Sequence, residues 1–132
     1  MVVDDDETTL QVLCAALEER GYHVASRNRS IGTSLAIARG QVDVVLLDVR
    51  MPALSGGRLA RLLANQTDPS PIVILHSSMP YAELEALAKE SGAAGFIEKT
   101  ADIGIFVRRF EQAVADAQLQ QSRAFRPSGP AT

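Results

Sequence analysis

Residues that could bind a metal ion or carry a phosphoryl group directly follow four short apolar runs of this sequence. Asp4 to Asp6 follow the first run, Asp48 follows Val44 to Leu47, His76 to Ser78 follow Ile72 to Leu75, and Lys99 comes shortly after the last run. Carboxylates that lie close together raise one another's pKa, and a hard cation such as Mg²⁺, which prefers oxygen ligands, relieves that repulsion. A carboxylate beside Mg²⁺ can attack phosphorus while a nearby ammonium neutralises the phosphoryl oxygens.

The apolar runs before these residues are typical of buried strands. Val44 to Leu47 are consecutive apolar residues, as in a strand covered on both faces of a parallel sheet. We expect strands at Met1 to Val3, Tyr22 to Ser26, Asp43 to Asp48, Ile72 to Leu75, and around Phe96 and Ile97.

Helical spacing of apolar residues fills the intervals between the strands. Leu10, Leu13, Cys14 and Leu17 fall on one face of a helix that we expect over Glu7 to Arg20, before Gly21. Ile31, Leu35 and Ala38 mark a second helix that closes at Gly40. Further helices are expected at Arg58 to Asn65, at Ala82 to Glu90 before Gly92, and from about Ile103 to about Gln121.

Alternating strands and helices predict an α/β domain with a parallel sheet. The carboxyl ends of such strands meet at one edge, which would bring the polar residues together. The chain of 132 residues is long enough for one domain, which we place at residues 1–121. Residues 122–132, which contain Pro127 and Pro130 and no periodicity, are expected to form a flexible tail.

Composition excludes several classes of protein. The net charge of −3 argues against a nucleic-acid-binding face, and Cys14 is alone, so no intramolecular disulfide can form. The longest apolar run is too short to span a bilayer, and acids stand where a signal peptide needs a basic start. We therefore expect a cytoplasmic protein that binds neither membrane nor nucleic acid directly.

The sequence resembles the receiver domain of bacterial two-component response regulators. The matching pieces are Val2 to Asp6, Asp43 to Pro52 with Gly56, Pro71 to Ser78, and Gly92 to Lys99. They recur in the family's order over about residues 1–120. The resemblance implies a flavodoxin-like, doubly wound sheet of five parallel strands in the order 2-1-3-4-5 with five helices.

The resemblance also implies a role for individual residues. Asp48 would be the phosphoacceptor, and Mg²⁺ would be held by Asp5 and Asp48, by the backbone carbonyl of Arg50, and by Asp4 through water. Lys99 would pair with the phosphoryl group. Phe96 stands where the family keeps an aromatic residue that changes rotamer on activation, and Arg50 and Met79 would tune dephosphorylation.

The switch hydroxyl has two candidate positions in this sequence. Counting from Pro71 indicates His76, whereas counting back from Lys99 indicates Ser77. We choose Ser77, because an imidazole cannot replace a hydroxyl and because the following residue, Ser78, is small as the family requires. Lys99 is followed by Thr100 where many members of the family have proline.

The resemblance implies a single-domain response regulator, a phosphoprotein that takes its phosphoryl group from a sensor histidine kinase or a histidine phosphotransfer protein. It would assist only its own phosphorylation and dephosphorylation, and would present its helix 4–strand 5–helix 5 face to a downstream protein or a second copy. The alternatives are a pseudo-receiver that is never phosphorylated and a receiver cut from a larger transcription regulator. A haloacid-dehalogenase-like phosphatase is disfavoured, because Arg50 stands where that class needs a second acid.

Overall fold

The computed structural model describes residues 1–29, 32–50, 58, 60–61, 63 and 70–124. Its strands are β1 (Val2–Val3), β2 (Ser26–Arg27), β3 (Val44–Asp48), β4 (Ile72–Ser77) and β5 (Gly95–Glu98). Its helices are α1 (Glu7–Glu19), α2 (Thr33–Gly40), α4 (Tyr81–Ser91) and α5 (Ile103–Ala124). The helix expected at Arg58 to Asn65 lies partly outside the described residues, and its described members 58, 60, 61 and 63 are helical.

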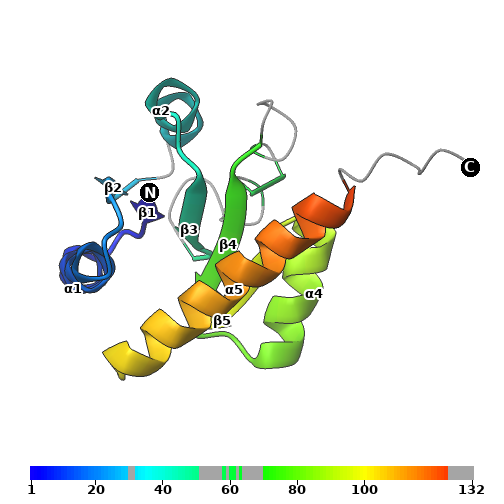
Figure 1. Ribbon diagram of the computed structural model, residues 1–132. Helices are drawn as coiled ribbons and strands as arrows, with labels where there is room; N and C mark the ends of the chain where they lie inside the picture. The colour runs from blue at the N-terminus through cyan, green and yellow to red at the C-terminus, as the bar shows by residue number, and fades with distance from the viewer. Residues whose placement is uncertain (30–31, 51–57, 59, 62, 64–69, 125–132) are drawn as a thin grey trace, which may run out of the picture.

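The strands form one parallel sheet in the order β2-β1-β3-β4-β5, which confirms the expected topology (Figure 1). Val2 is the partner of Ser26 on one side and of Leu46 on the other, so β1 lies inside the sheet. Asp48 is the partner of His76. The carboxyl ends of β1, β3, β4 and β5 therefore meet at one edge of the sheet.

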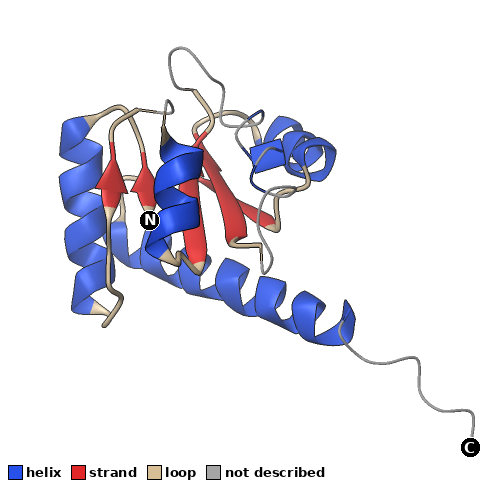
Figure 2. Ribbon diagram, turned by 90° about the horizontal axis from the view of Figure 1, so that it is seen from above, coloured by secondary structure: helices blue, strands red, loops and turns tan. Residues whose placement is uncertain are grey.

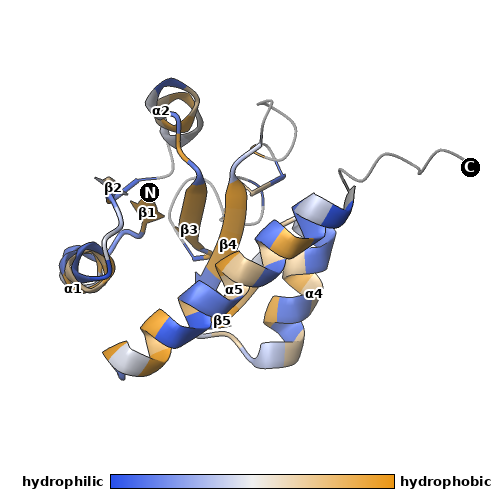
Figure 3. Cartoon of the chain, in the orientation of Figure 1, coloured by the Kyte–Doolittle hydropathy of each residue, from blue (hydrophilic) through white to orange (hydrophobic). Residues whose placement is uncertain are grey.

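Apolar clusters cover both faces of the sheet. One cluster joins alternate residues of β3 and β4, such as Leu46 and Ile74, to Phe106 and Phe110 of α5 and to the apolar face of α1. The other joins the intervening residues, such as Leu47 and Leu75, to α2 and α4. Figure 3 shows most of β3 and β4 as strongly apolar, up to the polar residues at their carboxyl ends, because both faces of these strands are buried.

The bounds of the second strand differ from the expectation. The strand covers Ser26–Arg27 rather than Tyr22 to Ser26, and His23 lies before it and is exposed. Because Val2 pairs with Ser26, residues 22–24 extend beyond the first strand residue of β1 and have no strand beside them. Periodicity identified the apolar segment, but pairing decides which of its residues belong to the sheet.

The buried stripe of α2 also differs from the expectation. Leu35 is 54% exposed and Ala38 is exposed, whereas Ile37 is buried. The helix packs through Thr33 and Ile37, which lie four residues apart on one face. The expected Ile31 lies outside the described residues.

The last helix is the longest element and crosses beside the sheet (Figure 2). Residues 122–124, which we expected in the tail, continue α5, and residues 125–132 lie outside the described part of the chain. Within the described residues, no helix is both long enough and apolar enough for a membrane span.

Candidate functional site

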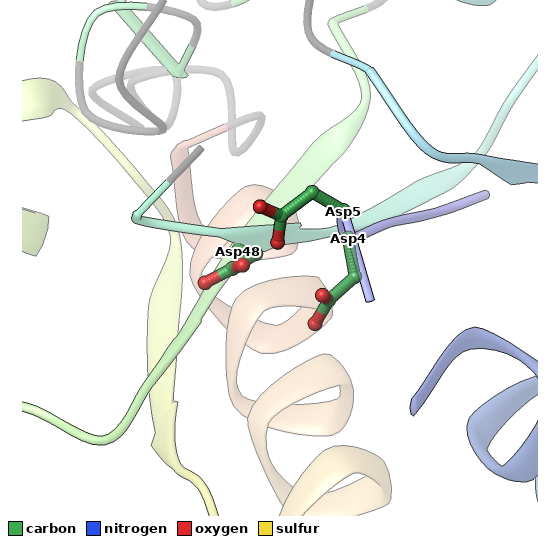
Figure 4. Close-up of side chains that lie close together, drawn as sticks. All are labelled: Asp4, Asp5 and Asp48. Carbon is green, nitrogen blue, oxygen red and sulfur yellow. The ribbon is translucent and has the colours of Figure 1, made fainter. Parts of the chain in front are cut away.

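Three carboxylates gather at the carboxyl edge of the sheet. Asp4 and Asp5 follow β1, and Asp48 is the last residue of β3. One oxygen from each lies within 4.8 Å of the others (Figure 4). Asp4 and Asp48 are buried and Asp5 is exposed. The sequence prediction that these acids come together is therefore confirmed, and the group is open to solvent on the side of Asp5.

The two acids after β1 have different surroundings. The Asp4 Oδ1 accepts a hydrogen bond from the Asp6 amide at 2.9 Å, and Oδ2 accepts one from the Lys99 ammonium at 3.3 Å. Among the described residues, none donates a hydrogen bond to the exposed Asp5 carboxylate. Asp4 is therefore engaged by protein groups, and Asp5 is the acid of this pair whose oxygens are available to an incoming ion.

The surroundings of Asp48 disfavour its charge. Burial raises the pKa of the Asp48 carboxyl, and the neighbouring Asp4 raises it further. The Lys99 ammonium and the Arg50 amide act in the opposite direction. That amide donates to Asp48 Oδ1 at 3.2 Å. A cation placed among the three acids would therefore stabilise the charged form of Asp48.

Lys99 joins β5 to the acid cluster. Its ammonium lies 3.3 Å from Asp4 Oδ2 and 3.5 Å from Asp48 Oδ1. Its side chain is 31% exposed, so the ammonium borders both the cluster and solvent. The Lys99 amide donates to the Ser77 carbonyl at 2.8 Å, which fixes the end of β5 against the end of β4. The expected placement of Lys99 at this edge is confirmed.

The two switch candidates at the end of β4 lie on opposite faces of the sheet. His76 is buried and its ring lies 5.4 Å from that of Phe106, on the face covered by α5. Alternation along the strand places Ser77 on the other face, with Leu75 and the α4 side of the core. Ser77 is also buried, and its Oγ accepts a hydrogen bond from the Met79 amide at 3.1 Å.

Phe96 lies on the same face as Ser77. It is partly buried against the cluster that contains Leu75, its partner in the sheet register. Its ring makes an edge contact with Tyr81 of α4, with centroids 5.1 Å apart, and Tyr81 is 55% exposed. Sequence reasoning did not identify Tyr81, although an aromatic residue opening a helix after the Ser77 segment was a visible signal.

The remaining expected site residues border the cluster. Arg50 is exposed and reaches Asp48 through its backbone amide, while Met79 is half-buried and reaches Ser77 through its own amide. Asp6 caps α1, because its carboxylate accepts from the Thr8 amide and from the Thr9 hydroxyl. The Thr9 hydrogen bond lowers the pKa of Asp6. Asp6 therefore serves the helix rather than the cluster.

Comparison with known proteins gives a consistent result. The family model of the response regulator receiver domain matches residues 1–111. Protein PilH of Pseudomonas aeruginosa is 32% identical over 104 residues, which cover 77% of this chain and 85% of PilH. The DNA-binding transcriptional regulator NtrC of Salmonella typhimurium is 31% identical over 134 residues, which cover 99% of this chain. This match spans only 28% of NtrC.

Solved structures share the fold. The BeF3-activated N-terminal receiver domain of Klebsiella pneumoniae RstA is 28% identical, with a TM-score of 0.76, and the match covers 85% of this chain and 94% of that one. Chemotaxis protein CheY4 of Vibrio cholerae has the same coverage, 20% identity and a TM-score of 0.74, which is a likeness of fold alone.

Proposed function

Since this chain belongs to the response regulator receiver domain family, we propose that Asp48 accepts a phosphoryl group in two-component signalling. The donor is a sensor histidine kinase or a histidine phosphotransfer protein. The single observation that carries the proposal is the cluster of Asp4, Asp5 and Asp48 within 4.8 Å, with Lys99 bonded to its edge.

The donor set of the cluster fits Mg²⁺. Carboxylate oxygens are hard ligands, and among the described residues the cluster contains no sulfur or imidazole ligand. Asp5 and Asp48 would hold the ion directly with the backbone carbonyl of Arg50, and Asp4 would act through water, because its oxygens already bond Asp6 and Lys99. When bound, Mg²⁺ supplies positive charge that offsets the carboxylates and orients the phosphoryl oxygens.

The side chains of this site would have different roles in phosphoryl transfer. A carboxylate oxygen of Asp48 forms the new bond to phosphorus while the P–N bond to the donor histidine breaks, and the imidazole nitrogen leaves with the bonding pair. The Lys99 ammonium, 3.5 Å from Asp48 Oδ1, neutralises charge on the transferred group. Arg50 and Met79, on either side of the site, would control the approach of the water that later hydrolyses the acyl phosphate.

Ser77 and Phe96 would couple the phosphoryl group on Asp48 to the conformation of the α4–β5–α5 face. A phosphoryl oxygen on Asp48 would accept a hydrogen bond from the Ser77 hydroxyl, and turning the side chain toward it would draw Oγ away from the Met79 amide, which now donates to Oγ at 3.1 Å. Loss of this bond would free the segment that enters α4. The Phe96–Tyr81 contact would then rearrange and change the α4–β5–α5 face, which a downstream protein or a second copy would bind.

Phosphorylation with a small donor tests the proposal directly. Incubation with radiolabelled acetyl phosphate and Mg²⁺ should give an acid-stable, hydroxylamine-labile label in the wild type and in Asp43→Asn, an exposed acid next to the other end of β3. The Asp48→Ala variant should remain unlabelled. Equal labelling of Asp48→Ala, or no labelling of the wild type, would refute the assignment.

The pseudo-receiver alternative makes a different prediction for metal binding. A chain that never takes phosphate needs no ion at the acids, so titration with Mg²⁺ should then show no binding that depends on Asp5. We propose that the wild type binds Mg²⁺ and that Asp5→Asn weakens this binding. The match to NtrC also leaves room for a receiver within a longer regulator, since it spans 28% of that protein.

A further inference from the structure

Residues 99–102 connect β5 to α5 at the carboxyl edge of the sheet, and Lys99 is the first of them. Its ammonium lies 3.3 Å from Asp4 Oδ2 and 3.5 Å from Asp48 Oδ1. A lysine side chain is a flexible stem that carries a point charge, so the position of its backbone decides where that charge can lie. The contacts that hold this connection therefore bear on the chemistry of Lys99.

The peptide group that enters Lys99 is held at both of its polar atoms. The Lys99 amide donates to the Ser77 carbonyl at 2.8 Å. The Glu98 carbonyl belongs to the same peptide group and accepts from Nη1 of Arg109 at 3.3 Å. Because Arg109 lies in α5, this peptide group is fixed between the end of β4 and the helix. The amino side of Lys99 is thus restrained.

The carboxyl side of Lys99 is held through Thr100. The Thr100 hydroxyl oxygen accepts a hydrogen bond from the Asp102 amide at 3.2 Å. A bond from a hydroxyl to the amide two residues later closes a turn, here over the exposed Ala101. This turn sets the direction in which the chain leaves Lys99.

Asp102 joins the turn to a rigid element. Its Oδ1 accepts from the Ile105 amide and its carbonyl accepts from the Phe106 amide, each at 3.0 Å, so Asp102 caps the start of α5. Phe106 is buried and packs in the apolar cluster on this face of the sheet. The Thr100 hydroxyl is therefore bonded to a residue whose own position is fixed by the helix.

We propose that Thr100 is a positioning residue for Lys99, an inference that rests on the function proposed above. The hydroxyl bond to the Asp102 amide holds the backbone after Lys99, so that the ammonium stays beside Asp4 and Asp48 and meets the phosphoryl group there. Proline, which many members of the family carry here, has no hydroxyl and restricts the backbone through its ring instead. In this chain the restraint is one hydrogen bond, and a single substitution removes it.

Three variants separate this hydrogen bond from other properties of the connection. Thr100→Val keeps the shape of the side chain and loses the acceptor, whereas Thr100→Ser keeps the acceptor. Asp102→Ala removes the carboxylate that caps α5 but keeps the amide that donates to Thr100. It therefore controls for a loss of helix stability that leaves the turn intact.

Lysine NMR in EDTA reports on the ammonium without any phosphorylation. The sequence contains two lysines, Lys89 and Lys99, and Lys89 is exposed on α4. With ¹³C at the lysine ε-carbon, the Lys99 signal should show restricted motion in the wild type, in Thr100→Ser and in Asp102→Ala. In Thr100→Val its relaxation should approach that of Lys89. Unchanged Lys99 motion in Thr100→Val, or an equal increase in Asp102→Ala, would overturn the proposal.

The rate of labelling by acetyl phosphate tests the consequence for phosphoryl transfer. At saturating donor and Mg²⁺, Thr100→Val should be labelled about tenfold more slowly than the wild type, because a displaced ammonium no longer meets the phosphoryl group. Thr100→Ser should be labelled at close to the wild-type rate. Labelling of Thr100→Val at the wild-type rate would also overturn the proposal. If the wild type takes no label, the proposed function fails, and the Lys99 signals in EDTA still decide whether Thr100 positions Lys99.

Discussion

Replacement of Asp48 by asparagine should stabilise the protein in the absence of divalent ions. The substitution keeps the shape of the side chain and its acceptor oxygen for the Arg50 amide, which now donates to Oδ1 at 3.2 Å. It removes a buried charge whose pKa is raised by burial and by Asp4. The folded chain therefore loses an electrostatic penalty and keeps most of its contacts.

The size of this effect follows from the distances in the cluster. At an effective dielectric constant of about 20, two carboxylate oxygens within 4.8 Å of each other repel by at least roughly 3 kcal/mol. On the same scale Lys99, at 3.5 Å, attracts Asp48 by roughly 4–5 kcal/mol, but it is shared with Asp4 and screened because it is 31% exposed. With two acids against one shared ammonium, we expect a net gain of about 1–2 kcal/mol, or roughly 5 °C in Tm.

Urea unfolding in EDTA measures this difference, with Asp43→Asn as the control outside the cluster. The penalty in the wild type is fully present above the raised folded pKa of Asp48, and it disappears as the pH falls and the carboxyl is protonated. The advantage of Asp48→Asn should therefore shrink between about pH 8 and about pH 4. A variant less stable than the wild type in EDTA at about pH 8 would refute the reasoning.

Three other predictions follow from contacts at the same edge of the sheet. In EDTA, the Lys99→Ala substitution should lower the free energy of unfolding by about 1–2 kcal/mol, because Asp4 and Asp48 lose their shared cation. Added Mg²⁺ should restore part of this loss. A variant as stable as the wild type in EDTA would contradict the pairing. Burial holds the pKa of His76 at about 3, so the folded chain resists its protonation and loses stability as the pH falls below about 6.5. The free energy of unfolding of His76→Leu relative to wild type should therefore rise by about 2 kcal/mol between about pH 8 and about pH 5, and a parallel pH dependence of the two proteins would count against a buried neutral imidazole. In fluorotyrosine NMR, beryllofluoride with Mg²⁺ should shift the Tyr81 signal of the wild type but not that of Ser77→Ala, and Tyr22 serves as the internal reference. A Tyr81 shift in Ser77→Ala equal to that in the wild type would exclude the hydroxyl as the switch.

The sequence was sufficient for the sheet and for the acids at its edge. The continuous apolar run Val44 to Leu47 predicted a strand buried on both faces, and the structure has it at the centre of the sheet. Asp4, Asp5 and Asp48 could be brought together without coordinates, because parallel strands in an α/β fold share their carboxyl edge. Both inferences depend only on residue type and chain order.

Features that depend on register could not be obtained in this way. Counting along the chain left His76 and Ser77 as alternatives, and only the packing of the helices on the sheet shows that His76 lies on the α5 face and Ser77 on the α4 face. The start of β2 depends on where β1 begins, and the exposed Leu35 shows that an apolar residue in a short helix need not lie on its buried face. The roles of Ser77 and Phe96 stay predictions that the perturbations above test.

Intact-mass spectrometry with peptide mapping tests the central claim most directly. After incubation with a phosphodonor and Mg²⁺, the account predicts that the protein gains the mass of one phosphoryl group and that the modified peptide contains Asp48. EDTA and Asp48→Asn should each abolish the gain. A phosphoryl group found on another residue, or one that forms equally well in EDTA, would contradict the account.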